Sequence, residues 1–165
     1  MRRVLARNHT PSRRDMLVQT AGPATECRMN AGFAKIYSLL CEYCGMYDGR
    51  VGAALGLLVR QFCDDTLRSE VPPPLAFAFG SAREGSNPKN PKMRNPSRGS
   101  LRFPKLRQDS RFHTEHVMRA NWLLRRTLED NPGTFREGED GFHELAAGLF
   151  MVGYDLGPAG LRARR

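Results

Sequence analysis

A run of three prolines at positions 72–74 begins the feature that most constrains how this chain folds. From there to about residue 112 the chain is rich in Gly, Pro, Asn and Ser, with a basic residue every few positions. Proline lacks the backbone N–H and clashes with the preceding helical turn, so no helix crosses this stretch. The 165 residues are therefore divided into helix-forming parts before and after a long irregular segment.

Apolar periodicity predicts two helices before the prolines. The first has an apolar stripe of Phe33, Ile36, Tyr37, Leu40 and Cys44. The second has a full amphipathic stripe of Val51, Ala54, Leu55, Leu58, Val59 and Phe62. The sequence Tyr47-Asp48-Gly49-Arg50 supplies a turn, so residues 26–70 are predicted to form a helical hairpin. Gly52 and Gly56 are poor helix formers, and we expect them to permit close approach of a neighbouring element.

Two more helices are expected after the irregular segment, at residues 114–129 and at 142–154 with Asp140 as the cap. Residues 75–79 are predicted to be either a short strand or an extended apolar anchor. The predicted fold is all-α, with two helical hairpins joined by a long irregular basic extension. We expect one helical domain at 26–161, with its basic loop at 72–112, between a basic arm at 1–25 and a basic tail at 162–165.

The positive charge lies outside the predicted helices. The chain has a net charge of +9. Residues 1–14 carry five Arg and no acid, and residues 82–111 carry nine basic and two acidic residues. Acidic residues outnumber basic ones in the helix-forming parts. This distribution predicts that the irregular segments lie on something negative, either nucleic-acid phosphate, anionic lipid headgroups or an acidic protein surface.

The candidate binding residues are the cations of the irregular segments. In the central segment they are Lys89, Lys92, Arg94, Arg98, Arg102, Lys105, Arg107 and Arg111, and in the N-terminal arm Arg2, Arg3, Arg13 and Arg14. Phe103 and Phe112 are interleaved with them. An extended basic strand with occasional aromatics follows a phosphate backbone and stacks on unpaired bases, so this pattern favours RNA.

The residues that carry catalysis or bind metals form no recognisable constellation. Cys41 and Cys44 are a single C-x-x-C pair with no second pair, and we expect buried cysteines without zinc. His113 and His116 are expected to be surface residues at a helix start. Residues 80–87 resemble a phosphate-binding loop, but Ser86 stands where that loop needs Lys. We therefore predict neither an enzyme nor a metal or cofactor site.

The Arg-rich, acid-poor N-terminal arm is typical of mitochondrial targeting segments. The cleanest apolar run, residues 51–59, is too short to cross a membrane. The first hypothesis is a non-catalytic structural subunit of a mitochondrial assembly, namely a lineage-specific ribosomal protein whose arms contact rRNA and whose helices meet neighbouring proteins. The alternative is an accessory subunit of a respiratory or ATP synthase complex, whose arms lie on protein subunits and anionic lipid of the inner membrane. An uncharacterised enzyme is a third, disfavoured hypothesis.

Overall fold

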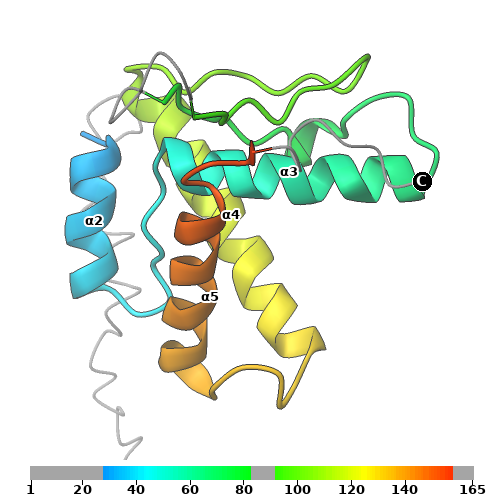
Figure 1. Cartoon of the computed structure of the whole chain (residues 1–165). Helices are drawn as coiled ribbons and strands as arrows, with labels where there is room; N and C mark the ends of the chain where they lie inside the picture. The colour runs from blue at the N-terminus through cyan, green and yellow to red at the C-terminus, as the bar shows by residue number, and fades with distance from the viewer. Residues whose placement is uncertain (1–27, 83–91, 158–165) are drawn as a thin grey trace, which may run out of the picture.

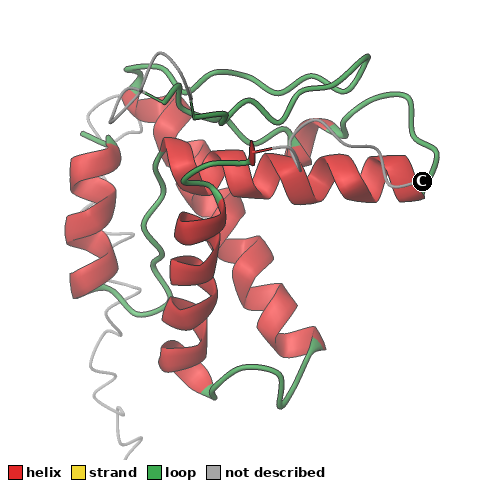
Figure 2. Ribbon diagram, viewed as in Figure 1, coloured by secondary structure: helices red, strands yellow, loops and turns green. Residues whose placement is uncertain are grey.

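The computed structural model describes residues 28–82 and 92–157, and within them the protein is all-helical, as predicted. The four helices are α2 (Ala31–Leu40), α3 (Gly49–Asp65), α4 (Ser110–Asp130) and α5 (Gly138–Val152), and a short 3-10 turn, η1, covers Pro73–Leu75. These residues contain no strand (Figure 2), and isolated bridges join Phe79 to Lys105 and Arg98 to Leu101. The predictions for Lys89, Arg2, Arg3, Arg13, Arg14 and Cys27 lie outside the described residues.

Helix α3 is the centre of the structure. It packs most extensively on α5, which also contacts α4. Figure 1 shows α3 crossing in front of α4 and above α5, while α2 stands to the left of α5 and residues 131–137 join α4 to α5 at the lower end. Ten of its 17 residues are buried, because irregular segments cover part of the surface that the other helices leave open. None of the described helices is both long and apolar enough to span a membrane.

Two glycines of α3 permit the close approach that the sequence predicted. A Cβ at Gly52 would collide with the carbonyl oxygen of Ala78, and one at Gly56 would lie 2.5 Å from Cγ of Pro96. Both neighbours, Ala78 and Pro96, belong to the irregular segment. Phe77, Ala78 and Phe79 are buried beside α3, so these three residues form the predicted apolar anchor, whereas Leu75 belongs to η1.

The predicted first helix and its turn were wrong in their bounds. Helix α2 ends at Leu40, Cys41 is extended, and residues 41–48 run to α3 as irregular chain. Cys44 is therefore on no helix. Asp48 is the N-cap of α3, where its carboxylate accepts from the N–H groups of Arg50 at 2.8 Å and Val51 at 3.1 Å. The Asp-Gly sequence starts a helix here instead of turning between two, because an Asp cap satisfies N–H groups of the first turn.

The apolar stripe of α2 does not face the core. Phe33 is 36% exposed, Ile36 50% and Leu40 60%, and the one fully buried residue of this helix is Ala34. The stripe was assigned inward because amphipathic helices usually bury their apolar side. Here the fully buried side chain is the small one of Ala34, and most of the large apolar side chains stay exposed.

Helices α4 and α5 bury the residues that their periodicity predicted. Val117, Ala120 and Leu124 are buried on α4, and Phe142 and Leu149 on α5. Helix α4 begins earlier than expected, because the Asp109 carboxylate accepts from the Phe112 N–H at 2.9 Å. Asp140 is in the first turn of α5 rather than at its cap, which is Glu137. Met118 and Trp122, expected beside the inward stripe of α4, are exposed.

Candidate nucleic-acid interface

The segment from 98 to 107 alternates between the core and the solvent. Leu101 and Phe103 are buried and Leu106 packs against the core, whereas Arg102, Lys105 and Arg107 are exposed. The backbone is held by hydrogen bonds within the segment and to residue 79. Arg98 and Leu101 exchange N–H···O hydrogen bonds of 3.0 Å, the Phe79 N–H donates to the Pro104 carbonyl at 3.0 Å, and the Leu106 N–H donates to Phe79 at 2.8 Å. The cations therefore project from an anchored backbone.

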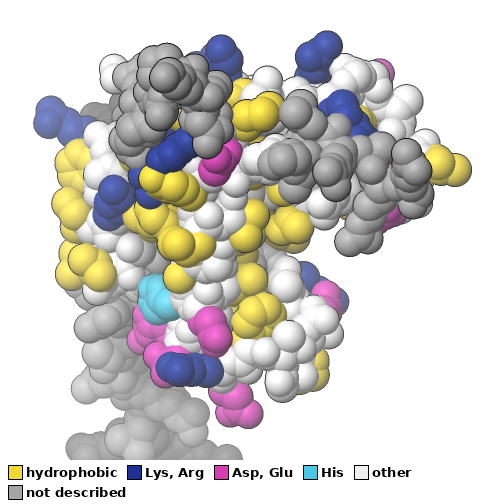
Figure 3. Space-filling model, in the orientation of Figure 1, with side chains coloured by type: hydrophobic (Ala, Val, Ile, Leu, Met, Phe, Trp, Pro, Cys, Tyr) yellow, Lys and Arg dark blue, Asp and Glu magenta, His cyan; other side chains and the backbone are white. Residues whose placement is uncertain are grey.

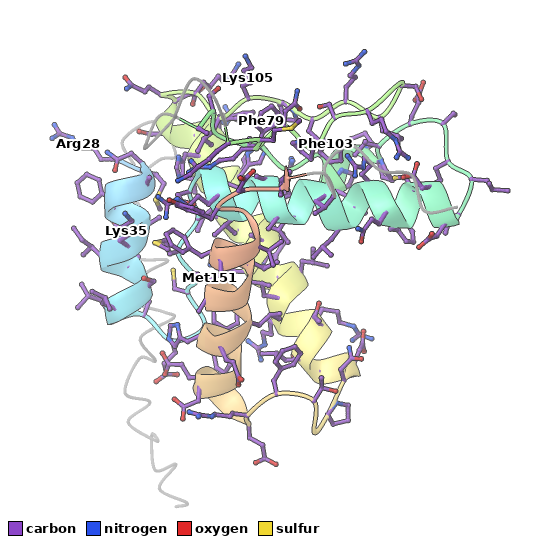
Figure 4. All side chains as sticks on the ribbon, in the orientation of Figure 1. Arg28, Lys35, Phe79, Phe103, Lys105 and Met151 are labelled. Carbon is purple, nitrogen blue, oxygen red and sulfur yellow. The ribbon has the colours of Figure 1, made fainter. Side chains whose placement is uncertain are left out.

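We call the exposed side chains of Arg102, Lys105, Arg107 and Arg111 the basic edge. Lys105 is labelled at the top of the molecule in Figure 4, above α3. Arg107 pairs with Asp109 at 3.2 Å and Arg111 with Glu115 at 3.7 Å, but their side chains stay 65% and 73% exposed. Such exposed pairs contribute about 0–1 kcal/mol, so they leave both guanidinium groups available to a phosphate.

Two of the predicted binding residues are turned toward the protein instead. Arg94 is 6% exposed and its Nε donates to the Tyr154 carbonyl at 3.1 Å. Arg98 forms a partly buried ion pair with Asp64 at 2.6 Å. Beside it, Arg60 of α3 is fully buried and donates to the Pro96 carbonyl at 3.0 Å, and its burial lowers the pKa of the guanidinium. Arg60 and Arg98 therefore fasten the segment to α3, and Arg94 fastens it to the chain just after α5.

The two aromatics of the segment are not open platforms for bases. Phe103 is buried against the Gly56 side of α3. Phe112 has the His116 ring at a centroid distance of 4.3 Å and the Arg107 guanidinium at 4.3 Å. The expectation that both rings stack on unpaired bases was wrong for Phe103. The basic edge offers charge and hydrogen-bond donors, which fit the phosphate backbone.

A second cluster of cations surrounds Tyr154, just after α5. The Arg50 guanidinium lies 5.0 Å from the Tyr154 ring centroid and 4.6 Å from that of Phe150, and the Lys92 ammonium lies 3.6 Å from the Tyr154 centroid. Asp155 accepts from the Met93 and Gly157 N–H groups, and these bonds, with Lys92 and Arg94 nearby, lower the pKa of its carboxyl. Sequence reasoning included Lys92 but missed Arg50, which lies far away along the chain.

The opposite end of the molecule is acidic. We call residues 129–144 the acidic end, since it exposes Glu129, Asp130, Glu137, Glu139, Asp140 and Glu144 and contains Arg136 as its one Lys or Arg. Figure 3 shows acidic side chains gathered at the lower end and basic ones along the upper part. Within the described residues, acidic side chains are therefore concentrated at one end and exposed basic ones at the other, which favours an anionic partner at the basic edge.

The histidines of α4 are structural. His113 and His116 are buried, so the prediction of surface histidines was wrong. His113 Nε2 donates to the Tyr47 carbonyl at 3.1 Å, and the Tyr47 hydroxyl donates to Ala78 at 2.7 Å. Burial lowers the pKa of His113, so the fold holds it neutral. These bonds join residue 47 to α4 and residue 78 to residue 47.

In the described part of the chain, the cysteines form no disulfide and no group of side chains is placed to bind a metal ion. Cys41, Cys44 and Cys63 form no disulfide; Cys41 and Cys63 are buried, as predicted, and Cys44 is half-buried. Burial raises the pKa of the Cys44 thiol, and nearby Cys41 raises it further. A thiol with a raised pKa is a weak nucleophile at neutral pH. No group of His, Cys, Asp and Glu in these residues is placed to hold a metal ion.

A groove between α3, α4 and α5 is almost wholly apolar. It has a volume of about 390 Å³ and its lining is Leu55, Leu58, Val59, Phe62, Leu75, Leu123, Leu124, Thr127, Leu145 and Leu149. Leu58 and Phe62 were predicted to face the core of the chain, yet they are exposed at this groove. Exposed apolar surface of this kind marks sites of protein association.

Comparison of the chain with known protein families, with curated proteins and with solved structures finds no match at any of the three levels.

Proposed function

We propose that this protein is a non-catalytic structural subunit of a large ribonucleoprotein and that it binds RNA phosphates through the basic edge. The observation that supports this most is the alternation at residues 101–107, which buries Leu101 and Phe103 and presents Arg102, Lys105 and Arg107 outward. Fixed cations lose little conformational entropy when they bind a phosphate backbone. An inert, mobile loop would need no such anchoring.

The assembly that we propose is the mitochondrial ribosome, with rRNA and neighbouring proteins as partners. The mitochondrial location in this proposal is supported by the Arg-rich, acid-poor N-terminal arm. In this proposal the helices meet proteins or solvent, and the irregular basic segment 72–112 lies on the RNA. The acidic end points away from the RNA, because phosphates repel it.

The basic edge is suited to the backbone of double-helical RNA rather than to unpaired bases. Proteins that bind single strands gain about 1–3 kcal/mol per base from stacking on aromatic rings. Phe103 is buried and Phe112 is flanked by Arg107 and His116, so this gain is missing. A duplex presents a denser, already ordered array of phosphates, which matches cations on a rigid backbone.

The salt dependence of RNA binding tests the proposal. With three or four phosphates neutralised, log K should fall against log salt with a slope of roughly −3, at about 0.9 per phosphate. Changing Arg102, Lys105 and Arg107 together to Gln should flatten the slope to about −1. The matched control changes Arg136 in the acidic end and Arg125 and Arg126 just before it to Gln, which removes the same charge and should leave the slope unchanged. Equal effects of the two triple variants would contradict the proposal.

The apolar groove favours a second candidate function, an accessory subunit of a respiratory or ATP synthase complex. A groove lined by leucines fits an apolar helix of a neighbouring subunit, with the basic edge lying on acidic protein or anionic lipid. Fractionation of mitochondria distinguishes the two candidate functions. A protein that stays with inner-membrane complexes after ribonuclease and high salt would exclude the ribosomal assignment, and one that leaves with ribonuclease-sensitive particles would exclude the accessory subunit.

A further inference from the structure

The face formed by α5 and α2 changes character from one end to the other. Figure 3 looks onto it and shows acidic side chains below, apolar ones in the middle and basic ones above. Along α5, Asp140, Glu144, Ala147 and Met151 recur at helical spacing on one outward stripe, and all four are exposed. Beyond the end of the helix, Lys92 and Arg50 flank Tyr154.

We propose that this face binds the same face of a second copy, with the two α5 helices antiparallel about a two-fold axis near Ala147. Asp140 lies seven residues before Ala147 and Tyr154 lies seven residues after it. At 1.5 Å per residue, Asp140 is about 10 Å from the axis, and Tyr154 lies just past the end of α5 on the other side of it. The two-fold therefore brings Asp140 of one copy opposite Tyr154 of the other, where Lys92 and Arg50 lie.

The middle of the face has the shape that such a crossing needs. Ala147 and Gly148 are small and exposed, and a Cβ at Gly148 would meet no atom within 4 Å, so a second helix can come close. Beside them a groove of about 380 Å³ runs between α2 and α5, and its lining includes Leu39, His143 and Ala146. The two-fold places Met151 of the second copy opposite residue 143, at this groove. Figure 4 shows Met151 on α5 and Lys35 on the neighbouring α2.

Charge complementarity selects a second copy over an unrelated helix. A surface that is acidic at one end, apolar in the centre and basic at the other is complementary to itself under a two-fold rotation. The face is small: α5 is about 22 Å long and two helices are about 20 Å wide, which gives roughly 400 Å². Stable interfaces bury about 800 Å² per partner, so we expect a weak dimer with a Kd near the micromolar range.

Sedimentation velocity of the full chain, after nuclease treatment, tests the dimer. From about 1 to about 200 µM, the range around the expected Kd, the mass should rise from 18.6 kDa toward twice that value. High salt should weaken the association, because the end contacts are charged and exposed. Met151→Glu should raise the Kd at least about tenfold. The matched control, Met118→Glu, makes the same change at an exposed methionine of α4 and should leave the Kd unchanged.

A charge swap tests the two-fold register. Asp140→Lys and Lys92→Glu should each weaken the dimer, and the double variant should restore it, because the two residues then attract again across the axis. A monomer over the whole concentration range would overturn the proposal. So would a dimer that Met151→Glu leaves intact, or a monomeric protein whose α5 face is instead occupied by a co-purifying protein that Met151→Glu releases.

Discussion

Helix α2 and the segment 92–107 are buried and exposed in the opposite way to what their sequences suggest. Helix α2 has regular apolar periodicity, yet Phe33, Ile36 and Leu40 are exposed. The segment 92–107 is basic and rich in Pro, Gly and Ser, yet Leu101 and Phe103 are buried in the core. The difference teaches that periodicity shows which residues share a face, whereas burial depends on what other parts of the chain are available to cover that face.

The consequence for function is that the two regions meet partners differently. The segment presents cations from a backbone that the fold already anchors, which suits a rigid anionic partner. Helix α2 presents apolar side chains that the described protein leaves uncovered, which suits a protein partner.

Truncation of an aromatic ring in each region should show the largest contrast. Phe103→Ala should lower the free energy of unfolding by about 3 kcal/mol, because it leaves a cavity beside α3. Phe33→Ala on α2 should cost less than about 1 kcal/mol, because its ring is already partly in water. Urea unfolding followed by circular dichroism measures both. Equal losses of unfolding free energy in the two variants would contradict the different burial of the two regions.

A methyl group at Gly52 tests how closely residues 77–79 approach α3. The added Cβ has no room beside the Ala78 carbonyl oxygen, so Gly52→Ala should destabilise the protein by about 2 kcal/mol. Gly148→Ala is the control in another helix, where the Cβ meets nothing and should stabilise by about 0.5 kcal/mol. Thermal unfolding should therefore shift in opposite directions. Stabilisation by both changes would show that residue 78 does not lie on α3.

The two kinds of arginine in the segment should respond differently to Gln. Arg98 pairs with Asp64 at 2.6 Å in a partly buried site, so Arg98→Gln should cost about 1 kcal/mol of stability. Arg102→Gln should change stability by less than about 0.5 kcal/mol, because its side chain is exposed. RNA affinity should show the reverse order. A larger stability loss at Arg102 would contradict the assignment of structural and binding arginines.

The smallest effect is the pH dependence that His113 confers. Its folded pKa is lowered by burial, so the unfolded chain binds the proton more readily. This contribution to stability is complete above the unfolded pKa of about 6.5 and declines as the pH falls below it. His113→Gln should be less stable at neutral pH but should lose less on going to about pH 5.5. Parallel pH profiles for the two proteins would show that His113 is not buried neutral.

The helices could be predicted from the sequence, and the way in which α3 is covered could not. The stripes of α4 and α5 were correct because their apolar residues are spaced evenly over several turns. The predicted turn at residues 47–50 was wrong because Asp48 was taken as a turn residue when it is the N-cap of α3. Gly52 and Gly56 indicated in the sequence that another part of the chain approaches α3 closely. The sequence did not show that the neighbours are Ala78 and Pro96.

Part of the candidate site was also within reach of the sequence. The sequence Leu101-Arg102-Phe103-Pro104-Lys105-Leu106-Arg107 alternates apolar and basic residues, and this signal of one-sided burial was missed among the surrounding Gly, Pro and Ser. The inward turn of Arg94 and Arg98 had no local signal, since their partners Tyr154 and Asp64 lie far away along the chain. The position of Arg50 at Tyr154 likewise had no local signal in the sequence, because the two residues lie far apart along the chain.

Hydrogen exchange of the isolated full chain tests most directly the claim that the basic segment belongs to the fold. The amides of Phe79, Leu101 and Leu106 donate to backbone carbonyls of the irregular segment, so they should exchange slowly, with protection close to that of α3. The amides of α2 should exchange faster, because that helix buries little. Fast exchange at Leu101 and Leu106, with α2 protected, would contradict the account and make residues 92–107 a mobile basic loop.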